Sequence, residues 1–254
     1  MTRPRLLVYC AVGALAYLVA LAATFPATWI ARALERASAE KLLVRAPEGT
    51  LWSGRARVYA RERSGPPLAL GELRWTTAWS GVFTGKLATD VTFGDAGRPV
   101  HLELSPFGVT VQALDIALPA RVLSAFVPGL ETVGPDGVLR LRSDSLRVED
   151  DSILGLAEVE WRQVRVSRAP GLDLGSHVAR LRGGGSKVDI DLGTLEGPLR
   201  LSGSGTWDLK TGLKGAGSAE HGAQVSPELI PFLRAVCPEY RNNSCEFRFA
   251  SGRG

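Results

Sequence analysis

An uncharged stretch near the N-terminus places the strongest constraint on how this chain folds. No charged side chain lies between Arg5 and Arg32. The apolar residues 6–25 are long enough to cross a bilayer as one helix, which takes roughly 20 residues. Because Arg3 and Arg5 precede this stretch, residues 1–5 are predicted to stay in the cytoplasm while the rest of the chain crosses. We therefore expect residues 6–25 to form a single transmembrane helix.

A cleaved signal peptide is the alternative interpretation of this stretch. Ala20, Leu21 and Ala22 have the small-x-small form that signal peptidase accepts. The apolar stretch is longer than a usual signal-peptide core of about 7–15 residues, and a helical pattern continues directly beyond it. This continuation favours a retained anchor, followed by a juxtamembrane helix over residues 26–43. Both interpretations export the part of the chain that follows.

From Val44 onward the spacing of apolar residues changes from about 3.6 to about 2, which indicates a sheet. The chain has 29 Gly, 15 Pro and only 7% aromatic residues, which fits short strands and tight turns better than a helical bundle. We predict a mainly β protein, in which a transmembrane helix precedes a curved antiparallel sheet with two or three short helices. The predicted strands are residues 56–60, 69–75, 84–93, 100–104, 109–118, 137–142, 146–148, 155–161, 164–166, 174–181, 187–192, 198–207, 213–220 and 245–249.

Two short helices are predicted within the β-rich domain, at residues 119–127 and 227–236. Each helix follows a group of strands and precedes another strand. The domain, residues 44–254, therefore has the layout of an approximate duplication, with halves of about 44–133 and 134–254. Such a layout predicts one extended sheet whose apolar face or ends are covered by the short helices.

Charge and cysteine content narrow the class of protein. The net charge is +4, but Arg alternates with Asp and Glu along the predicted strands, so we expect no nucleic-acid partner. Cys10 lies within the apolar stretch, where it is a small hydrophobic residue. Cys237 and Cys245 bracket residues 238–244, and they form either a local disulfide in an oxidising compartment or two free thiols.

No group of residues has the pattern of a catalytic, cofactor or metal site. His101, His177 and His221 are scattered, and each is predicted to lie on the surface or on a strand face. Residues 183–187 lack the spacing of a phosphate-binding loop and indicate a flexible hairpin tip. The acidic residues 149–151 indicate a solvated turn rather than a calcium site. We therefore predict a protein without enzymatic activity, cofactor or metal.

One short motif stands apart from this general pattern, the sequence G-T-L-W-S-G directly after the predicted juxtamembrane helix. Together with residues 159–162 and 197–205, this motif closely resembles type II secretion system protein N, the N component of the general secretion pathway. The order of anchor, motif, short helix and later strands also fits that family over nearly the whole chain. The motif residues are Gly49, Thr50, Leu51, Trp52, Ser53 and Gly54.

The resemblance implies an accessory component of the machine that exports folded proteins across the bacterial outer membrane. It implies a single-pass protein of the inner membrane whose C-terminal domain lies in the periplasm, and whose partners are other inner-membrane secretion components or the secretin. The motif is expected to be structural, because Gly49 and Gly54 allow a tight turn around Trp52, whose ring would seal the first hairpin against the sheet. No family role is carried onto Cys237 or Cys245.

A second hypothesis concerns lipid. An anchored, curved sheet with an apolar concave face also resembles the AsmA-like periplasmic proteins, so phospholipid is the alternative partner. Alternating strands such as residues 155–161 would present apolar side chains into such a trough. If the apolar face were closed into a core, it could not bind lipid in this way.

Overall fold

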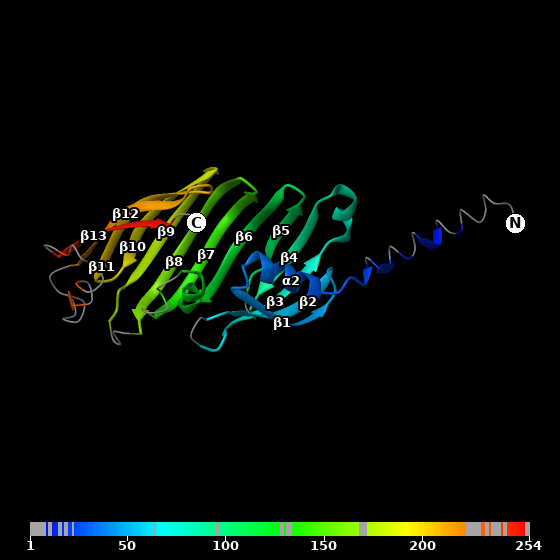
Figure 1. Cartoon of the computed structure of the whole chain (residues 1–254), viewed down its shortest axis with the longest axis horizontal. Coiled ribbons are helices and arrows are strands. Elements are labelled where there is room, and N and C mark those ends of the chain that lie inside the picture. The colour runs from blue at the N-terminus through cyan, green and yellow to red at the C-terminus, as the bar shows by residue number, and fades with distance from the viewer. Residues whose placement is uncertain are drawn as a thin grey trace.

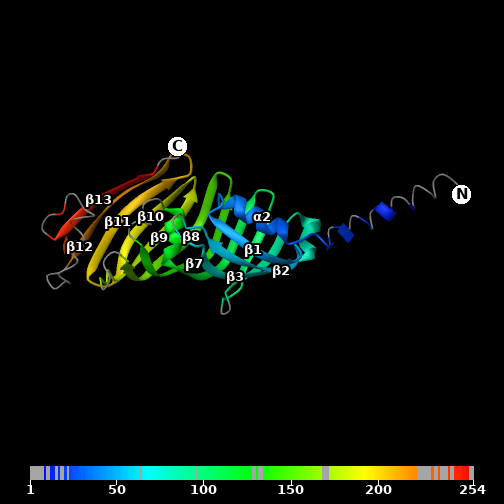
Figure 2. The same cartoon turned by 60° about the horizontal axis from the view of Figure 1, so that its bottom comes forward.

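The computed structural model describes residues 9, 12–14, 17, 20–21, 23–62, 65–94, 97–127, 130, 134–167, 172–221, 230–231, 234, 240 and 243–251. Over these residues, thirteen strands form one antiparallel sheet in which every strand pairs with its neighbours in sequence. The sheet is curved, and its longest helix lies on one of its faces (Figures 1 and 2). The predicted mainly β class, with an antiparallel meander and short helices, is therefore confirmed.

The strands differ in length, and the longest lie in the middle of the sheet. They are β1 (Leu42–Gly49), β2 (Ser53–Ala60), β3 (Leu68–Thr77), β4 (Leu87–Phe93), β5 (Val100–Ser105), β6 (Gly108–Pro119), β7 (Pro135–Glu149), β8 (Ser152–Val166), β9 (Ser176–Gly185), β10 (Lys187–Glu196), β11 (Leu199–Asp208), β12 (Gly212–His221) and β13 (Ser244–Ser251). The helices are α2 (Thr28–Ala37), η1 (Trp79–Thr84), η2 (Ala120–Val122) and α3 (Leu123–Phe126).

The helix predicted over residues 26–43 is shorter in the structure. Its helix α2 ends at Ala37, and the next turn places Ala39 and Glu40 at positive φ angles of 51° and 60°. The chain then enters β1 at Leu42, a strand that is missing from the predicted set. Leu42 and Leu43, at the end of the predicted helix, pair with β2 instead. Contact with the neighbouring strand therefore decides the conformation here, against the helical spacing of the local sequence.

In the structure, four predicted strands in the middle of the chain are joined into two long strands, β7 and β8. The segments 137–142 and 146–148 are continuous because a bulge between Arg142 and Leu146 shifts the register without ending the ladder. In β8, the predicted strands 155–161 and 164–166 are likewise joined through an irregularity, at Gln163, which has a φ of 51°. By contrast, the predicted strand 84–93 begins only at Leu87, after the turn of η1.

One face of the sheet is apolar, and we call it the apolar face. The helix α2 packs on it against Val44, Ala56 and Trp75, through Ala27 and Ala31. The helices η2 and α3 pack on the same face further along the sheet, in a second buried cluster formed by Ala60, Ala120, Val122, Ala125 and Leu139. A third cluster lies nearer the C-terminal strands and contains Val164, Val166, Leu172, Leu174, Leu199, Ala219 and Cys245.

The short helix predicted at residues 119–127 is present as η2 and α3, whereas most of the one predicted at 227–236 lies outside the described residues. One sheet joins the two predicted halves, because β6 in the first half pairs with β7 in the second from Gly108 to Pro119. Most of residues 6–25 also lies outside the described part. Within that part, no helix is long and apolar enough to span a bilayer. The anchor and the duplication stay predictions.

Candidate functional site

The G-T-L-W-S-G motif forms the turn between β1 and β2. The Thr50 hydroxyl accepts a hydrogen bond from the Trp52 N–H at 3.2 Å, and the Thr50 N–H donates to the Ser53 carbonyl at 2.8 Å. The turn also holds the segment that precedes α2, because the Leu51 N–H donates to the Phe25 carbonyl at 2.8 Å. The motif therefore ties the entry of the chain to the first hairpin.

Strand β3 holds this turn in place through two hydrogen bonds. The Thr77 N–H donates to the Trp52 carbonyl at 2.7 Å, and the Trp75 indole N–H donates to the Thr50 carbonyl at 3.0 Å. The Trp52 ring is buried at 8% exposure and stacks on Trp79, with 3.7 Å between the ring centroids and 18° between the planes. Stacked aromatic pairs contribute stability beyond the area that they bury. These contacts fit a structural motif.

The two glycines of the motif have different reasons to be glycine. Gly49 has a φ of 93°, a left-handed conformation that other residues rarely adopt. Gly54 has no such angle, but a Cβ there would lie 2.5 Å from the Trp75 ring and 2.4 Å from the Glu48 carbonyl oxygen. Only a residue without a side chain lets the Glu48 carbonyl of β1 and the Trp75 ring of β3 lie this close to β2.

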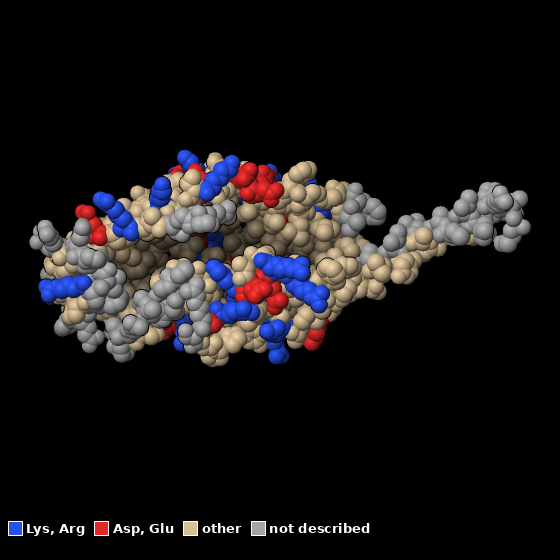
Figure 3. Space-filling model, viewed as in Figure 1, with Lys and Arg blue, Asp and Glu red and all other residues tan. Residues whose placement is uncertain are grey.

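Away from the helices, the apolar face is only partly covered. Figure 3 shows a hollow along the middle of this face, with charged side chains gathered on its two rims. Cross-strand register places apolar residues of neighbouring strands side by side here, as in the pairing of Leu102 with Val111 and of Val111 with Leu146. Half-buried side chains on this face include Leu102, Val109, Val111, Leu114, Leu146, Ile153, Leu181, Ile190 and Leu192.

The opposite face, which we call the polar face, carries a row of ion pairs across β6 to β8. Arg140 donates two hydrogen bonds of 2.7 Å to the Asp115 carboxylate. Glu160 accepts from Arg162 at 2.7 Å and from Arg142 at 2.9 Å, and only 6% of its side chain is exposed. Opposite charges on adjacent strands of one face stabilise the pairing and fix its register.

These arginines keep the carboxylates ionised. The hydrogen bond from Arg162 lowers the pKa of Glu160 against the opposing effect of burial, and the hydrogen bond from Arg140 does the same to the pKa of Asp115. Both carboxylates therefore contribute stability at neutral pH. This contribution is lost only as the pH falls below the unperturbed range near about 4 and through the lowered values.

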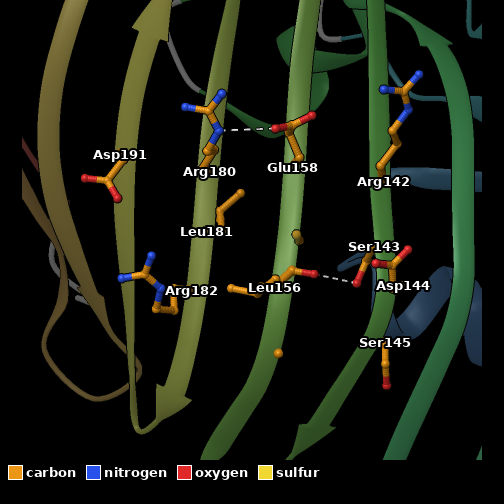
Figure 4. A pocket seen from close by; sticks show the side chains of 12 residues that line it. Arg142, Ser143, Asp144, Ser145, Leu156, Glu158, Arg180, Leu181, Arg182 and Asp191 are labelled. Carbon is orange, nitrogen blue, oxygen red and sulfur yellow. Dashed lines mark hydrogen bonds and ion pairs between the residues drawn. The ribbon is translucent and has the colours of Figure 1, made fainter.

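Beside this row, the polar face has a hollow of about 570 Å³ that we call the Leu156 hollow. It lies where β7 bulges, and Ser143 donates to the Leu156 carbonyl at 2.6 Å across the bulge. The Leu156 side chain is 62% exposed, and Arg180 donates to Glu158 at 3.3 Å next to it. Figure 4 shows the charged side chains around Leu156, with Asp144, Arg182 and Asp191 on the neighbouring strands.

The remaining sequence candidates do not meet in one place. The three histidines lie on β5, β9 and β12, and within the described residues no group of three or more His, Cys, Asp or Glu side chains has the arrangement of a metal site. His177 and His221 are buried rather than on the surface, and burial lowers the pKa of His177. Residues 183–187 do form a hairpin tip, between β9 and β10, and residues 149–151 form the turn between β7 and β8.

Cys245 is 2% exposed in the C-terminal cluster and is disulfide-bonded. Cys237 lies outside the described residues, so the pairing of Cys237 with Cys245 stays a prediction.

The sequence pattern pointed to Trp52 but missed Trp79 and Leu156. Trp79 lies in η1, within a segment that carries no strand or helix signal of its own. Leu156 takes a polar-face position between Gly155 and Ala157. The sequence signal that could have identified it is the run of apolar residues at 153–157, which places apolar side chains on both faces of the strand. A strand with only one buried face requires apolar residues at every second position.

Comparison with known proteins gives one match. The family model of type II secretion system protein N matches residues 40–244, which contain the whole motif and twelve complete strands. Neither the curated proteins nor the solved structures include a significant match. The matched range extends from the end of the α2 turn to the first residue of β13, so nearly the whole described sheet falls within it. The chain therefore belongs to the type II secretion system protein N family.

Proposed function

We propose that this chain is a non-enzymatic accessory component of the type II secretion system, held in the inner membrane by residues 6–25 with its sheet in the periplasm. Its role is to contact other secretion components, rather than to carry out a reaction. Family membership supports the role in secretion. The Leu156 hollow is the observation that supports a contact role.

The Leu156 hollow has the composition of a protein-binding patch. An exposed leucine is surrounded by side chains of both charges, including Arg180 and Arg182. Protein interfaces combine an apolar centre with a polar rim, and they are enriched in arginine. The position is also held by backbone pairing, because the hollow lies on four paired strands, β7 to β10, near the middle of the sheet. A partner that inserts an apolar side chain beside acidic groups would match it.

Site-specific crosslinking tests this proposal. A photoreactive residue at position 156 of the full chain, expressed in its own host, is expected to capture a type II secretion component. The control is position 195 on β10, where Leu195 is also exposed, at 45%, but lies outside the hollow. Recovery of no secretion component from position 156, or equal recovery from both positions, would count against the Leu156 hollow as the contact site.

A second candidate function is lipid binding in the hollow of the apolar face. The observation that favours it is the partial exposure of apolar residues there, up to 38% for Leu104 and 37% for Val148. Contiguous exposed apolar side chains on a protein surface mark binding sites. An acyl chain would cover it, while charged side chains on the rims would face water and headgroups (Figure 3).

Native mass spectrometry of the full chain, extracted with mild detergent, tests the lipid candidate. Co-purified phospholipid is expected on the natural sequence, and Val148→Glu is expected to reduce the bound fraction by about tenfold, since it places a charge where an acyl chain would lie. Arg147→Glu on the polar face is the matched control. A lipid-free natural protein, or equal lipid on both variants, would reject this candidate.

A further inference from the structure

The two edges of the sheet are built differently, and β1 forms the capped one. Side chains of the α2 region bind its outward N–H groups. Ser38 Oγ accepts from the Leu42 N–H at 3.1 Å, and Glu35 Oε1 accepts from the Val44 N–H at 2.9 Å. The register of β1 also shifts between Arg45 and Glu48. Capped donors and a bulge both prevent a further strand from pairing.

The other edge, β13, has no such cover within the described residues. No described strand pairs with its outer side. The His221 N–H donates to the Asn243 carbonyl at 3.1 Å, so residues 243, 245, 247 and 249 direct their backbone groups toward β12. The backbone groups of the even-numbered residues therefore point to the outer side. These residues are Ser244, Glu246, Arg248 and Ala250.

The side chains of β13 are also sorted by face. Glu246 and Arg248 are exposed on the polar face, while Phe247 and Phe249 are half-buried on the apolar face. The two phenylalanine rings lie over glycines of β12, where they leave no room for a Cβ at Gly217 or Gly215. The two rings therefore lean back over their own sheet, away from the outer side of β13.

We propose that a second copy of this chain pairs with β13, antiparallel, with Phe247 opposite the partner's Phe247. The outward backbone groups require even-numbered residues to face even-numbered residues. Among such registers, this one sets Glu246 opposite the partner's Arg248, twice by symmetry. A two-residue slide in either direction, centred on residue 246 or 248, sets like charges opposite each other. Opposite charges therefore select the register.

This pairing closes on itself. The contact uses the same edge of both copies, so it gives a dimer with two-fold symmetry. A fibre would need β13 of one copy to pair with β1 of the next, and the side chains of Ser38 and Glu35 block that. The two apolar faces lie on the same side, so the dimer joins them into one longer face. The dimer goes beyond the proposed function and does not depend on it.

Charge exchange on β13 tests the dimer by sedimentation of the full chain in mild detergent over a range of concentrations. The natural protein is expected to dimerise. Glu246→Arg alone and Arg248→Glu alone each set like charges opposite each other at two places, so each is expected to raise the dimer dissociation constant by about tenfold. The double exchange restores both pairs and is expected to return the constant to within about threefold of the natural value.

Arg200→Glu, an equally exposed reversal on β11, is the control for net charge and should leave the dimer unchanged. All three positions carry exposed side chains, and circular dichroism checks that the four variants fold alike. A monomeric natural protein at every concentration would overturn the proposal. So would single variants that dimerise like the natural protein, or a double exchange that fails to restore the dimer.

Discussion

Replacing Trp52 by alanine is expected to lower the free energy of unfolding by about 3–5 kcal/mol. The ring is 8% exposed, stacks on Trp79 and lies over the turn that ties β1, β2 and β3 together. Its removal would leave a cavity that the fixed backbone around Thr77 cannot fill. Urea unfolding of the full chain in detergent, followed by circular dichroism, measures the loss.

The partner tryptophan supplies the control. Trp79 is 46% exposed, so Trp79→Ala is expected to cost about 1–2 kcal/mol, well below the Trp52 variant. The double variant should then cost less than the sum, by about 0.5–1.5 kcal/mol, because the stacking is lost only once. A Trp52→Ala protein as stable as the natural one would show that the motif has no structural role.

Replacing Leu139 by aspartate is expected to cost about 4 kcal/mol or more, enough to unfold many single domains. Leu139 is 4% exposed beneath η2 and α3, where it packs among apolar side chains that offer a carboxylate no compensation for the loss of water. Ala117→Asp is the matched control, because this exposed position pairs with Arg140 on the polar face of the same sheet. It should change stability by less than about 0.5 kcal/mol.

Thermal unfolding of the two aspartate variants compares the faces directly. A large loss at position 139 and little at 117 is the result expected for a sheet with one apolar and one polar face. Equal losses at the two positions would contradict the assignment of the faces.

Much of the sheet could be predicted from sequence because alternation is a local signal. The strands from β9 to β12 lie close to their predicted positions, since period-two alternation and glycine turns bound each of them. Whether a strand continues across a bulge, by contrast, does not depend on the local sequence alone. The chain between Arg142 and Leu146 has no alternation of its own, and only the neighbouring strands keep it in the ladder. The start of β1 was missed for the same reason.

The candidate surfaces were harder to predict than the strands. The motif around Trp52 is contiguous in sequence, so its residues could be identified together. The Leu156 hollow brings together side chains from β7, β8, β9 and β10, and only the register places Arg182 beside Leu156. The capping of β1 by Glu35 and Ser38 likewise depends on how α2 folds back onto the sheet. Spacing in the sequence carries no information on such contacts.

Release of secreted proteins into the medium tests the central claim most directly. In the native host, deletion of this chain is expected to retain type II substrates in the periplasm, and the natural sequence should restore their release. Leu156→Asp should restore little of it, whereas the control Leu195→Asp should restore it fully. A deletion strain that releases these substrates as well as its parent would contradict a role in secretion.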